Sequence, residues 1–564
     1  MKNIKRIISI SLVAMLLTSS NLITYASNEV SFTKNNDKKF IISESGTKKV
    51  GSLVKKTTVP SQSIKINENM PTAYSSVDKG YITSVKNQET HNTCWTFTAM
   101  AVMESALLKN GFGEYDLSEE HLDIWATARE NNTGWLRDLN SGSFSETALG
   151  YFASWQGARL EADIPFNYAT GKTFSEVDKL GKTEYGATDI VILPNDIKTI
   201  KTAIMNYGAV GANFAANSIF FNSNKTATYA YKTFSSTSQI EGHAITVVGW
   251  DDTYSRKNFK TNYQPVNDGA WLCKNSWGTN TGDNGYIWIS YEDKYLFGDK
   301  LSATYAIKNV QKIEDNTKLY QVENDGAVYD FSINITENGA TVPADDMTFF
   351  NVFDFTEQYG NLDSVMFETQ SVGAEYDIYY VPLNNNGDII NDEKQWTYLT
   401  GGTVDYSGYI NAKTNFELPY TKGALAVRID GSENDIASTM GCNEWLTISG
   451  GKYIYMPDVK KDASYLKLFD KIYNLPDFYS SMLDDEIGSN FVIKAITSAD
   501  DGLLKADVSR DSKISSKDLM LIQRYILGIT KLNRNEIYCA DINSDKAISV
   551  KDAMLLQRQL LGIV

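Results

Sequence analysis

The last 65 residues contain a duplicated segment, and this duplication constrains the fold more than any other feature of the chain. A twelve-residue run begins at Asp507 and recurs 34 residues later, at Asp541. Positions 1, 3, 5 and 12 of both runs carry oxygen-bearing side chains, position 8 is Ile, and a helical pattern containing Gln-Arg follows. This spacing is typical of loops that bind Ca²⁺ through side-chain oxygens and the carbonyl of position 7. We therefore expect two structural calcium sites, with the candidate ligands Asp507, Ser509, Asp511, Asp518, Asp541, Asn543, Asp545 and Asp552.

No entering helix precedes the first loop, so the segment is not a full EF-hand. The pair of loops, each followed by a helix, resembles a type I dockerin, the module that attaches enzymes to cohesin domains of a cellulosome scaffoldin. The resemblance implies a cohesin partner and folding that depends on Ca²⁺. Two departures stand out. Ser512 and Lys546 replace the usual glycine at position 6, where a left-handed turn is required. Ser509 replaces the usual Asn, so we expect weaker calcium binding at the first loop.

The composition narrows the class of protein. A chain of 564 residues predicts three or four domains, and 42% hydrophobic with 22% charged residues is ordinary for globular proteins. The formal charge of −16, without a Lys/Arg-rich stripe, argues against nucleic acid as a partner. Four cysteines are too few and too scattered for a disulfide scaffold, and three histidines leave few candidates for a catalytic base.

The N-terminus has the pattern of an export signal. Three basic residues within positions 2–6 precede an apolar run over 7–17, and small residues follow near 24–26. We expect a signal peptide at 1–26; the alternative is an uncleaved N-terminal anchor. No later segment reaches 18 uninterrupted apolar residues, so no membrane span is expected. The mature protein should be secreted and extracellular, at the cell surface or on a cellulosome. Residues 27–70, polar and locally basic, predict a pro-segment or N-terminal arm.

Two larger regions lie between this arm and the repeat. Residues 71–305 predict an α+β domain: a buried helix from Thr93 to about Lys109, a helix start capped by Ser118, and later strands at 244–250, 270–274 and 286–291. Residues 315–495 predict a β-sandwich of short strands parted by Gly, Asn and Asp, for example 375–381, 397–399, 424–429 and 453–456. Residues 500–564 predict a small all-α calcium-binding module. The expected fold is therefore multidomain.

Cys94 is the candidate nucleophile. It lies at the first turn of the buried helix, where the positive end of the helix dipole favours the thiolate form. The alternative is inert packing, the usual role of a free cysteine. His243 heads an apolar strand and Asn275 ends the next one, so an amide oxygen can orient an imidazole, with Trp277 shielding that bond from water. Gln88 and the backbone N–H of Cys94 form a candidate oxyanion hole.

Four separated blocks resemble papain-like cysteine peptidases: Val85-Lys86-Asn87-Gln88 with Cys94-Trp95-Thr96-Phe97, Leu117-Ser118-Glu119-Glu120, Gly242-His243-Ala244, and Lys274-Asn275-Ser276-Trp277-Gly278 with Gly285-Tyr286. The resemblance implies a two-subdomain fold with Cys94 as nucleophile, His243 as acid and base, Asn275 as its orienting partner and Gln88 as oxyanion donor. It also implies that Gly142 and Trp277 contact a peptide substrate. No cofactor is implied for catalysis.

The chain departs from the papain-like pattern at three places. His91 stands where the family has the first of two nearby cysteines, and the stretch 140–143 contains no partner cysteine. The long inhibitory prodomain of the family is missing too. Of the remaining candidates, we expect His121 at the surface or half-buried without a catalytic role, His91 in the loop beside the thiol, and Cys273 in the core.

The middle region contains no histidine and no catalytic cluster. It resembles the lectin-like β-domain that follows the catalytic domain in some bacterial papain-like peptidases. Trp396, Tyr398 and Trp445 are candidates for carbohydrate binding, with packing in the sandwich as the alternative.

The sequence therefore predicts a secreted cysteine peptidase anchored to a cellulosome through a calcium-dependent dockerin. The alternative is a non-catalytic protein with a degenerate peptidase fold and a carbohydrate-binding β-domain. The subsite preferences, endo- or exopeptidase action, the natural substrate and the cohesin type stay open.

Overall fold

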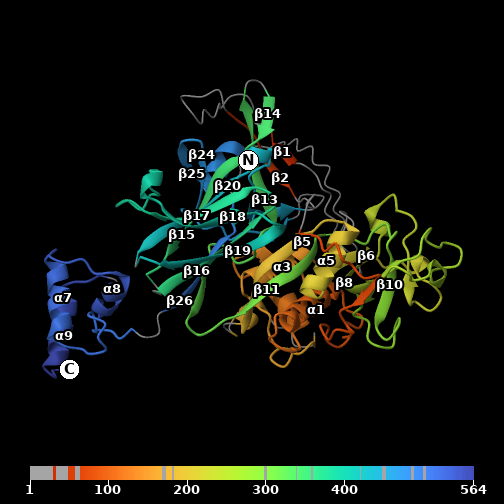
Figure 1. Ribbon diagram of the computed structural model, residues 1–564, viewed down its shortest axis with the longest axis horizontal. Coiled ribbons are helices and arrows are strands. Elements are labelled where there is room, and N and C mark those ends of the chain that lie inside the picture. The colour runs from red at the N-terminus through yellow and green to blue at the C-terminus, as the bar shows by residue number, and fades with distance from the viewer. Residues whose placement is uncertain are drawn as a thin grey trace, which may run out of the picture.

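The computed structural model describes residues 30–32, 49–56, 64–167, 173–178, 180, 183–297, 302–337, 340–356, 360–419, 421–447, 453–483, 488–499, 503–545 and 547–563. The predicted signal peptide at 1–26 lies outside these residues. Figure 1 shows three parts in a row: a mixed α/β part, a β-rich part in the middle and a small helical part at the C-terminus.

The first part is built around helix α1 (Cys94–Lys109), whose side chains from Trp95 to Leu107 are all buried. The helix is apolar nearly all round, as predicted, and packs against strands β8 (Gly242–Asp251) and β11 (Thr304–Lys312). Further helices are α2 (Glu119–Trp125), α3 (Ser145–Ala153), α4 (Phe174–Asp178) and α5 (Ile197–Tyr207). Ser118 caps α2 as predicted, because its Oγ accepts a hydrogen bond from the His121 N–H at 3.0 Å.

One sheet runs through both the first and the middle part. Its twelve strands include β3 (Ala73–Ser75), β5 (Tyr185–Leu193), β6 (Val210–Ala215), β7 (Ala227–Thr228), β9 (Ala270–Lys274) and β10 (Tyr286–Ser290), together with β8 and β11. The middle part adds β12 (Thr317–Tyr320), β16 (Gly360–Thr369), β19 (Ser407–Glu417) and β26 (Ile493–Ala499). The junction is the antiparallel pairing of β19 with β5, in register from Ser407↔Ile192 to Tyr409↔Ile190. The two predicted domains therefore share backbone hydrogen bonds as well as side-chain contacts.

A second sheet completes the predicted sandwich. Its order is β18 (Thr397–Thr403), β17 (Glu375–Pro382), β20 (Lys422–Asp430), β15 (Asp346–Asp354), β24 (Ser464–Leu468) and β25 (Lys471–Asn474). β15 and β20 contact β26 of the long sheet, and the helix α6 (Leu475–Leu483) closes the β24–β25 end. Strand 453–456 does not belong to this sandwich, contrary to our expectation. It forms β23 (Tyr453–Met456), which pairs with β22 (Leu446–Thr447) and with β4 (Gly134–Trp135) of the first part.

Two described strands of the N-terminal arm lie on the middle part, whereas Asn67 near its end donates to Thr202 of α5 in the first part. Strands β1 (Val30–Phe32) and β2 (Lys49–Lys56) pair with each other, and β2 pairs antiparallel with β13 (Tyr329–Glu337). The same sheet contains β14 (Ala340–Pro343) and β21 (Met440–Cys442). The backbone of the arm thus extends a sheet of the β-rich part.

Buried ion pairs strengthen the junction between the first two parts. Lys494 on β26 is fully buried, pairs with Glu323, and donates to Ser154 Oγ beyond the end of α3 at 3.0 Å. Arg129 makes a two-bond pair with Asp325. The Arg129–Asp325 pair crosses the junction, whereas Lys494 and Glu323 belong to the same part and Lys494 crosses it through its hydrogen bond to Ser154.

The C-terminal part contains α7 (Ser516–Ile526), α8 (Arg534–Ala540) and α9 (Val550–Leu560), with α7 packed on α9. The predicted repeat therefore folds as loop plus helix twice, with α8 between. Among the described residues no helix is both long and apolar enough to cross a membrane.

Candidate active site

Cys94 is the first residue of α1, and its sulfur faces strand β8. The backbone N–H of Ala244 donates to Cys94 Sγ at 3.4 Å, which places the sulfur beside the residue that follows His243. Thr93, at the N-cap, makes no side-chain capping bond, and no acidic residue occupies the first turn. The first N–H groups of α1 therefore remain directed at the sulfur and at any group bound next to it.

His243 and Asn275 are in direct contact on adjacent strands β8 and β9. His243 Nε2 lies 2.9 Å from Asn275 Oδ1, and because an amide oxygen only accepts, the ring donates from Nε2 and keeps the lone pair of Nδ1. Asn275 Oδ1 also accepts from the Ser276 N–H at 2.8 Å, which fixes the amide. The Trp277 ring lies 4.7 Å from the His243 ring, centroid to centroid.

Gln88 lies in the loop before Cys94 and is held at both ends of its amide. Its Nε2 donates to His91 O at 2.6 Å, and its Oε1 accepts from Ser276 Oγ at 2.6 Å. The Gln88 N–H donates to Ser276 O at 2.8 Å. One Nε2 hydrogen remains for a ligand beside Cys94, because the amide nitrogen has two.

Burial controls the ionisation of both candidate reactive groups. It raises the pKa of the Cys94 thiol, and the N–H groups of Ala244, Trp95 and Cys94 lower it only in part. Burial also lowers the pKa of His243 to about 4, against the opposing hydrogen bond to Asn275. Desolvation therefore opposes the preference for the thiolate that the helix N-terminus provides. In this buried site a thiolate on Cys94 or an imidazolium on His243 is costly alone. The two charges should therefore form together, by proton transfer from the sulfur to the imidazole.

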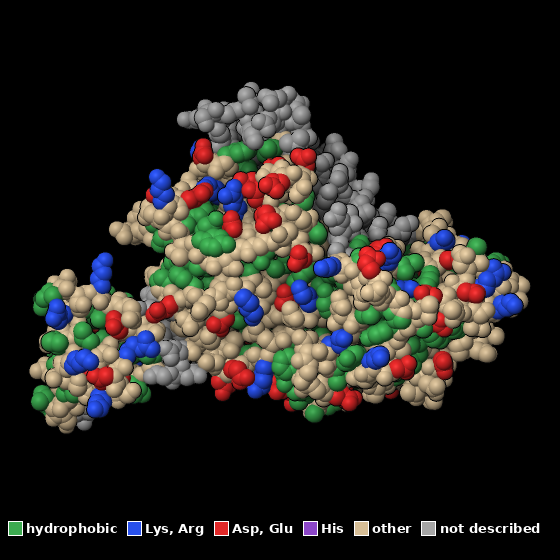
Figure 2. All heavy atoms as spheres, in the orientation of Figure 1, with side chains coloured by type: hydrophobic (Ala, Val, Ile, Leu, Met, Phe, Trp, Pro, Cys, Tyr) green, Lys and Arg blue, Asp and Glu red, His purple; other side chains and the backbone are tan. Residues whose placement is uncertain are grey.

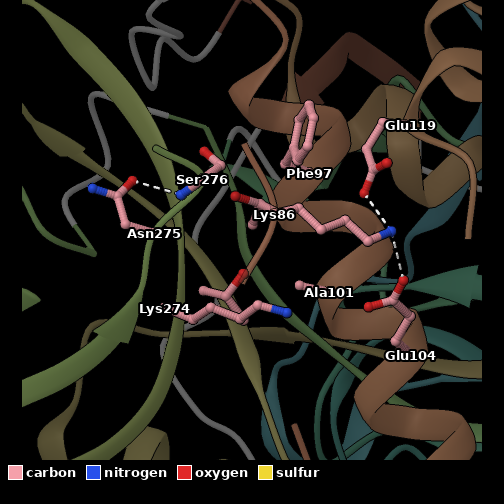
Figure 3. Close-up of a pocket in the computed structure, with 10 residues that line it drawn as sticks. Lys86, Phe97, Ala101, Glu104, Glu119, Lys274, Asn275 and Ser276 are labelled. Atoms are coloured by element: carbon pink, nitrogen blue, oxygen red, sulfur yellow. Dashed lines mark hydrogen bonds and ion pairs between the residues drawn. The ribbon is translucent and has the colours of Figure 1, made fainter. Parts of the chain in front are cut away.

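A buried charge cluster lines a pocket that also borders Asn275 and Ser276, next to α1 (Figure 3). Lys86 Nζ contacts Glu104 Oε1 at 2.9 Å, Glu119 Oε1 at 2.9 Å and Asp116 Oδ1 at 2.7 Å. Burial opposes the charge of Lys86, but Glu119 and Glu104 raise its pKa above the ordinary value. Lys274 joins the cluster through Thr83 Oγ1, at 3.0 Å.

This cluster fixes the chain next to two candidate catalytic residues. Lys86 precedes Gln88 by two positions, and Lys274 directly precedes Asn275. In Figure 3 the Lys274 and Asn275 side chains point in different directions, Lys274 into the pocket beside Lys86 and Asn275 away from it. Sequence reasoning missed the cluster, although Lys86, Glu119 and Lys274 all lie within the motif blocks.

Gly142 lies in the loop before α3 and is half-buried. Within the described part of the chain, nothing hydrogen-bonds to its N–H or C=O. The carbonyl of the preceding Ser141 is used instead, by Trp95 Nε1 at 3.1 Å and by Arg137. The free backbone of Gly142 is available to pair with an extended peptide.

The other histidines and cysteines do not join this group. His121 is buried, contrary to our expectation: Tyr151 Oη contacts its Nδ1 at 2.7 Å, and burial lowers its pKa to about 3. It lines a separate cavity of about 350 Å³ between α2 and β12. His91 lies in the loop before Cys94, with its ring against Phe166. Cys273 is fully buried in β9, as predicted.

The C-terminal loops bury four carboxylates, Asp507, Asp518, Asp541 and Asp552. Asp518 accepts from the N–H groups of Ser509 and Ser515, and Asp552 accepts in the same way from Ile542 and Ser549. Within the described ranges no three His, Cys, Asp or Glu side chains are gathered closely enough to hold a metal. The donor set nevertheless fits Ca²⁺, because every candidate ligand atom is a carboxylate, amide or hydroxyl oxygen.

Comparisons with known proteins give matches for all three parts of the chain. Family models match residues 70–307 (papain family cysteine protease), 319–497 (lectin like domain) and 505–561 (dockerin type I domain). The chain is 29% identical to cathepsin S of Bos taurus over 223 residues and 26% identical to cathepsin L2 of Homo sapiens over 230 residues. These matches cover 39% and 40% of this chain, and 60% and 63% of the two cathepsins' own length.

Two solved structures extend the likeness across the first two parts. The clostridial cysteine protease Cwp84 after propeptide cleavage is 40% identical, with a TM-score of 0.66 over 76% of this chain and 99% of that one. The cysteine protease and lectin-like domains of Cwp84, a surface layer associated protein of Clostridium difficile, are 39% identical, with a TM-score of 0.67 over 78% and 91%. The protein belongs to the papain family of cysteine proteases and carries a lectin-like domain and a type I dockerin domain.

Proposed function

We propose that the protein hydrolyses peptide bonds through an acyl-enzyme formed on Cys94. His243 Nδ1 accepts the thiol proton, and the sulfur attacks the scissile carbonyl carbon. The imidazolium is stabilised through its Nε2–H bond to Asn275 Oδ1. It then protonates the leaving amine, which departs as the C–N bond breaks and a thioester remains. His243 next removes a proton from water, the hydroxide attacks the thioester, and the carboxylic acid product leaves with Cys94 restored.

The oxyanion of each tetrahedral intermediate lies between the Cys94 N–H and the second Nε2–H of Gln88. One such donor typically contributes about 2.7–4 kcal/mol to the transition state. The free backbone of Gly142 pairs with the substrate chain, and Trp277 excludes water from the His243–Asn275 bond.

The observation that carries this proposal is the 2.9 Å contact between His243 and Asn275, next to a sulfur held at the N-terminus of α1. The test is Cys94→Ala in the full chain, with a fluorogenic peptide amide as substrate. We expect hydrolysis to be abolished while cohesin binding persists. Unchanged turnover in this variant would refute the assignment and favour the non-catalytic alternative.

We further propose that the dockerin attaches the enzyme to a cohesin domain of a scaffoldin outside the cell. Bound Ca²⁺ would supply the positive charge that brings the loop carboxylates together. Asp507, Ser509, Asp511 and Asp518 would hold one ion, and Asp541, Asn543, Asp545 and Asp552 the other. The dockerin match and the surface-layer origin of Cwp84 support an extracellular or cell-surface location.

A carbohydrate is the candidate ligand of the lectin-like domain. Trp396 and Tyr398 both contact the Tyr379 ring, at 5.7 Å each, and Tyr398 is 57% exposed. Trp445, the third aromatic candidate, is half-buried. Glycan binding that is unaffected by Tyr398→Ala would contradict a role for this face.

A further inference from the structure

Two loops close to Cys94 in the structure are joined by the side chain of Asn140. The first loop, residues 88–93, contains Gln88 and leads into α1; the second, residues 139–142, contains Gly142. Asn140 Oδ1 in the second loop accepts a hydrogen bond from the Asn92 N–H in the first, at 2.7 Å. All four cysteines are free, so no disulfide joins these loops.

Asn140 is itself held rigidly. Its φ is 59°, in the left-handed region where Asn is among the few tolerated non-glycine residues. Its N–H donates to Asp123 Oδ2 at 2.9 Å. Asp123, on α2, is fully buried and pairs with Arg137 at 2.6 Å. Both the backbone and the side chain of Asn140 therefore have a fixed direction.

Arg137 continues this connection to the helix of the nucleophile. Its guanidinium lies 4.9 Å from the ring of Trp95, the residue after Cys94, and it donates to the carbonyls of Asp123 and Ser141. Trp95 Nε1 donates to the same Ser141 carbonyl.

We propose that Asn140 is a positioning residue for hydrolysis, which anchors the oxyanion loop to the substrate-binding loop. The Asn92 N–H that it binds follows directly after His91, whose carbonyl accepts from Gln88 Nε2 at 2.6 Å. Fixing Asn92 therefore fixes the carbonyl that orients the Gln88 amide. The inference rests on the proposed peptidase function. The contribution of Asn140 should appear in the chemical step of peptide hydrolysis and not in the reactivity of the Cys94 thiol, because only hydrolysis uses the oxyanion donors.

The test compares Asn140→Gly with Asn140→Asp in the full chain. Glycine accepts the left-handed backbone but removes the acceptor oxygen, whereas aspartate keeps the oxygen and tolerates the same φ. For a fluorogenic peptide amide we expect kcat to fall about 5- to 10-fold in Asn140→Gly, as for a lost hydrogen bond, and to stay within about twofold in Asn140→Asp. Alkylation of Cys94 by iodoacetamide, which forms no oxyanion, should change less than about twofold in both variants.

Two results would overturn the proposal. In the first, Asn140→Gly retains the kcat of the parent. In the second, Asn140→Gly loses kcat, alkylation rate and thermal stability together, as a merely structural residue would. A parent chain that does not hydrolyse the substrate at all, yet is alkylated at Cys94, would instead overturn the proposed function and the positioning role with it.

Discussion

The peptidase and lectin-like parts, residues 64–499, differ from the dockerin, residues 503–563, in what holds the chain together. The former share a twelve-stranded sheet and large apolar clusters, with ion pairs buried at their junction. The dockerin core contains eight buried residues: Ala506, Val508, Ile522, Leu532, Cys539, Ala540, Ala553 and Leu556. A module this small has little apolar burial to offset its conformational entropy, so the acidic loops need an additional source of stability.

Removal of Ca²⁺ by a chelator should give the largest difference between the two regions. In excess EGTA, we expect α7 and α9 to lose at least about 100-fold of their amide exchange protection, because the loop carboxylates then lack a cation and repel one another. The peptidase and lectin-like parts should be unaffected. Hydrogen exchange of the full chain, with and without Ca²⁺, measures both regions in one sample. Equal protection of α7 in the two conditions would show that the dockerin folds without metal.

The second largest effect is expected at the junction of the peptidase and lectin-like parts. Lys494→Met leaves the Glu323 charge buried without its cation, which should cost about 3–5 kcal/mol of unfolding free energy. Lys312→Met is the matched control, because Lys312 pairs with Glu314 at the surface and should cost less than about 1 kcal/mol. Denaturant unfolding compares the two variants. Equal losses would mean that the buried pair does not stabilise the junction.

The stability of the lectin-like part should depend on pH through two buried carboxyl groups. Asp330 and Glu368 are buried side by side, and burial raises the pKa of both carboxyl groups. The folded pair keeps its proton to a higher pH than the unfolded chain. Its contribution to stability is therefore complete below the unfolded pKa, near 4, and is lost as pH rises through the raised values.

Glu368→Gln removes one of the two titrating groups. When the pH rises from 5.5 to 8.5, the free energy of unfolding should fall by about 1–2 kcal/mol less in the variant than in the parent. Urea unfolding at the two pH values gives this difference, with the exposed Glu375→Gln as a control. Identical pH profiles for parent and Glu368→Gln would contradict the buried, protonated pair.

The smallest predicted effect is at Ser512, whose φ of 64° is the left-handed conformation expected at position 6 of the calcium loop. Ser512→Gly should relieve this backbone conformation and raise calcium affinity a few-fold, or by up to about 1 kcal/mol. Ser516→Gly, the same change at the start of α7, should instead lower stability. Calorimetric titration of both variants with Ca²⁺ measures the calcium affinity. A loss of affinity in Ser512→Gly would contradict the prediction.

Local patterns predicted the elements well and their long-range pairing poorly. The helix from Cys94, the Ser118 cap and the strand at 270–274 are encoded by neighbouring residues, so they were predictable. The pairing of β19 with β5 joins segments more than 200 residues apart, which no local pattern reports. The same reason explains the displaced strand β23.

The candidate site shows the same contrast. Motifs identified Cys94, His243, Asn275 and Gln88 because each lies in a recognisable block. The burial of His121 and the contacts of Asp123 with Arg137 and Asn140 depend on tertiary packing, so sequence reasoning missed them. The acid between two apolar residues in the helix capped by Ser118 was the signal that could have pointed to Asp123.

Mass spectrometry of the full chain after reaction with an active-site-directed epoxide tests whether Cys94 is the nucleophile. We expect one adduct per chain, on Cys94, together with complete loss of peptide hydrolysis. Cys273, Cys442 and Cys539 should stay unmodified because they are buried. Hydrolysis that persists in chains fully modified at Cys94, or an adduct on another cysteine that accounts for the inhibition, would contradict it.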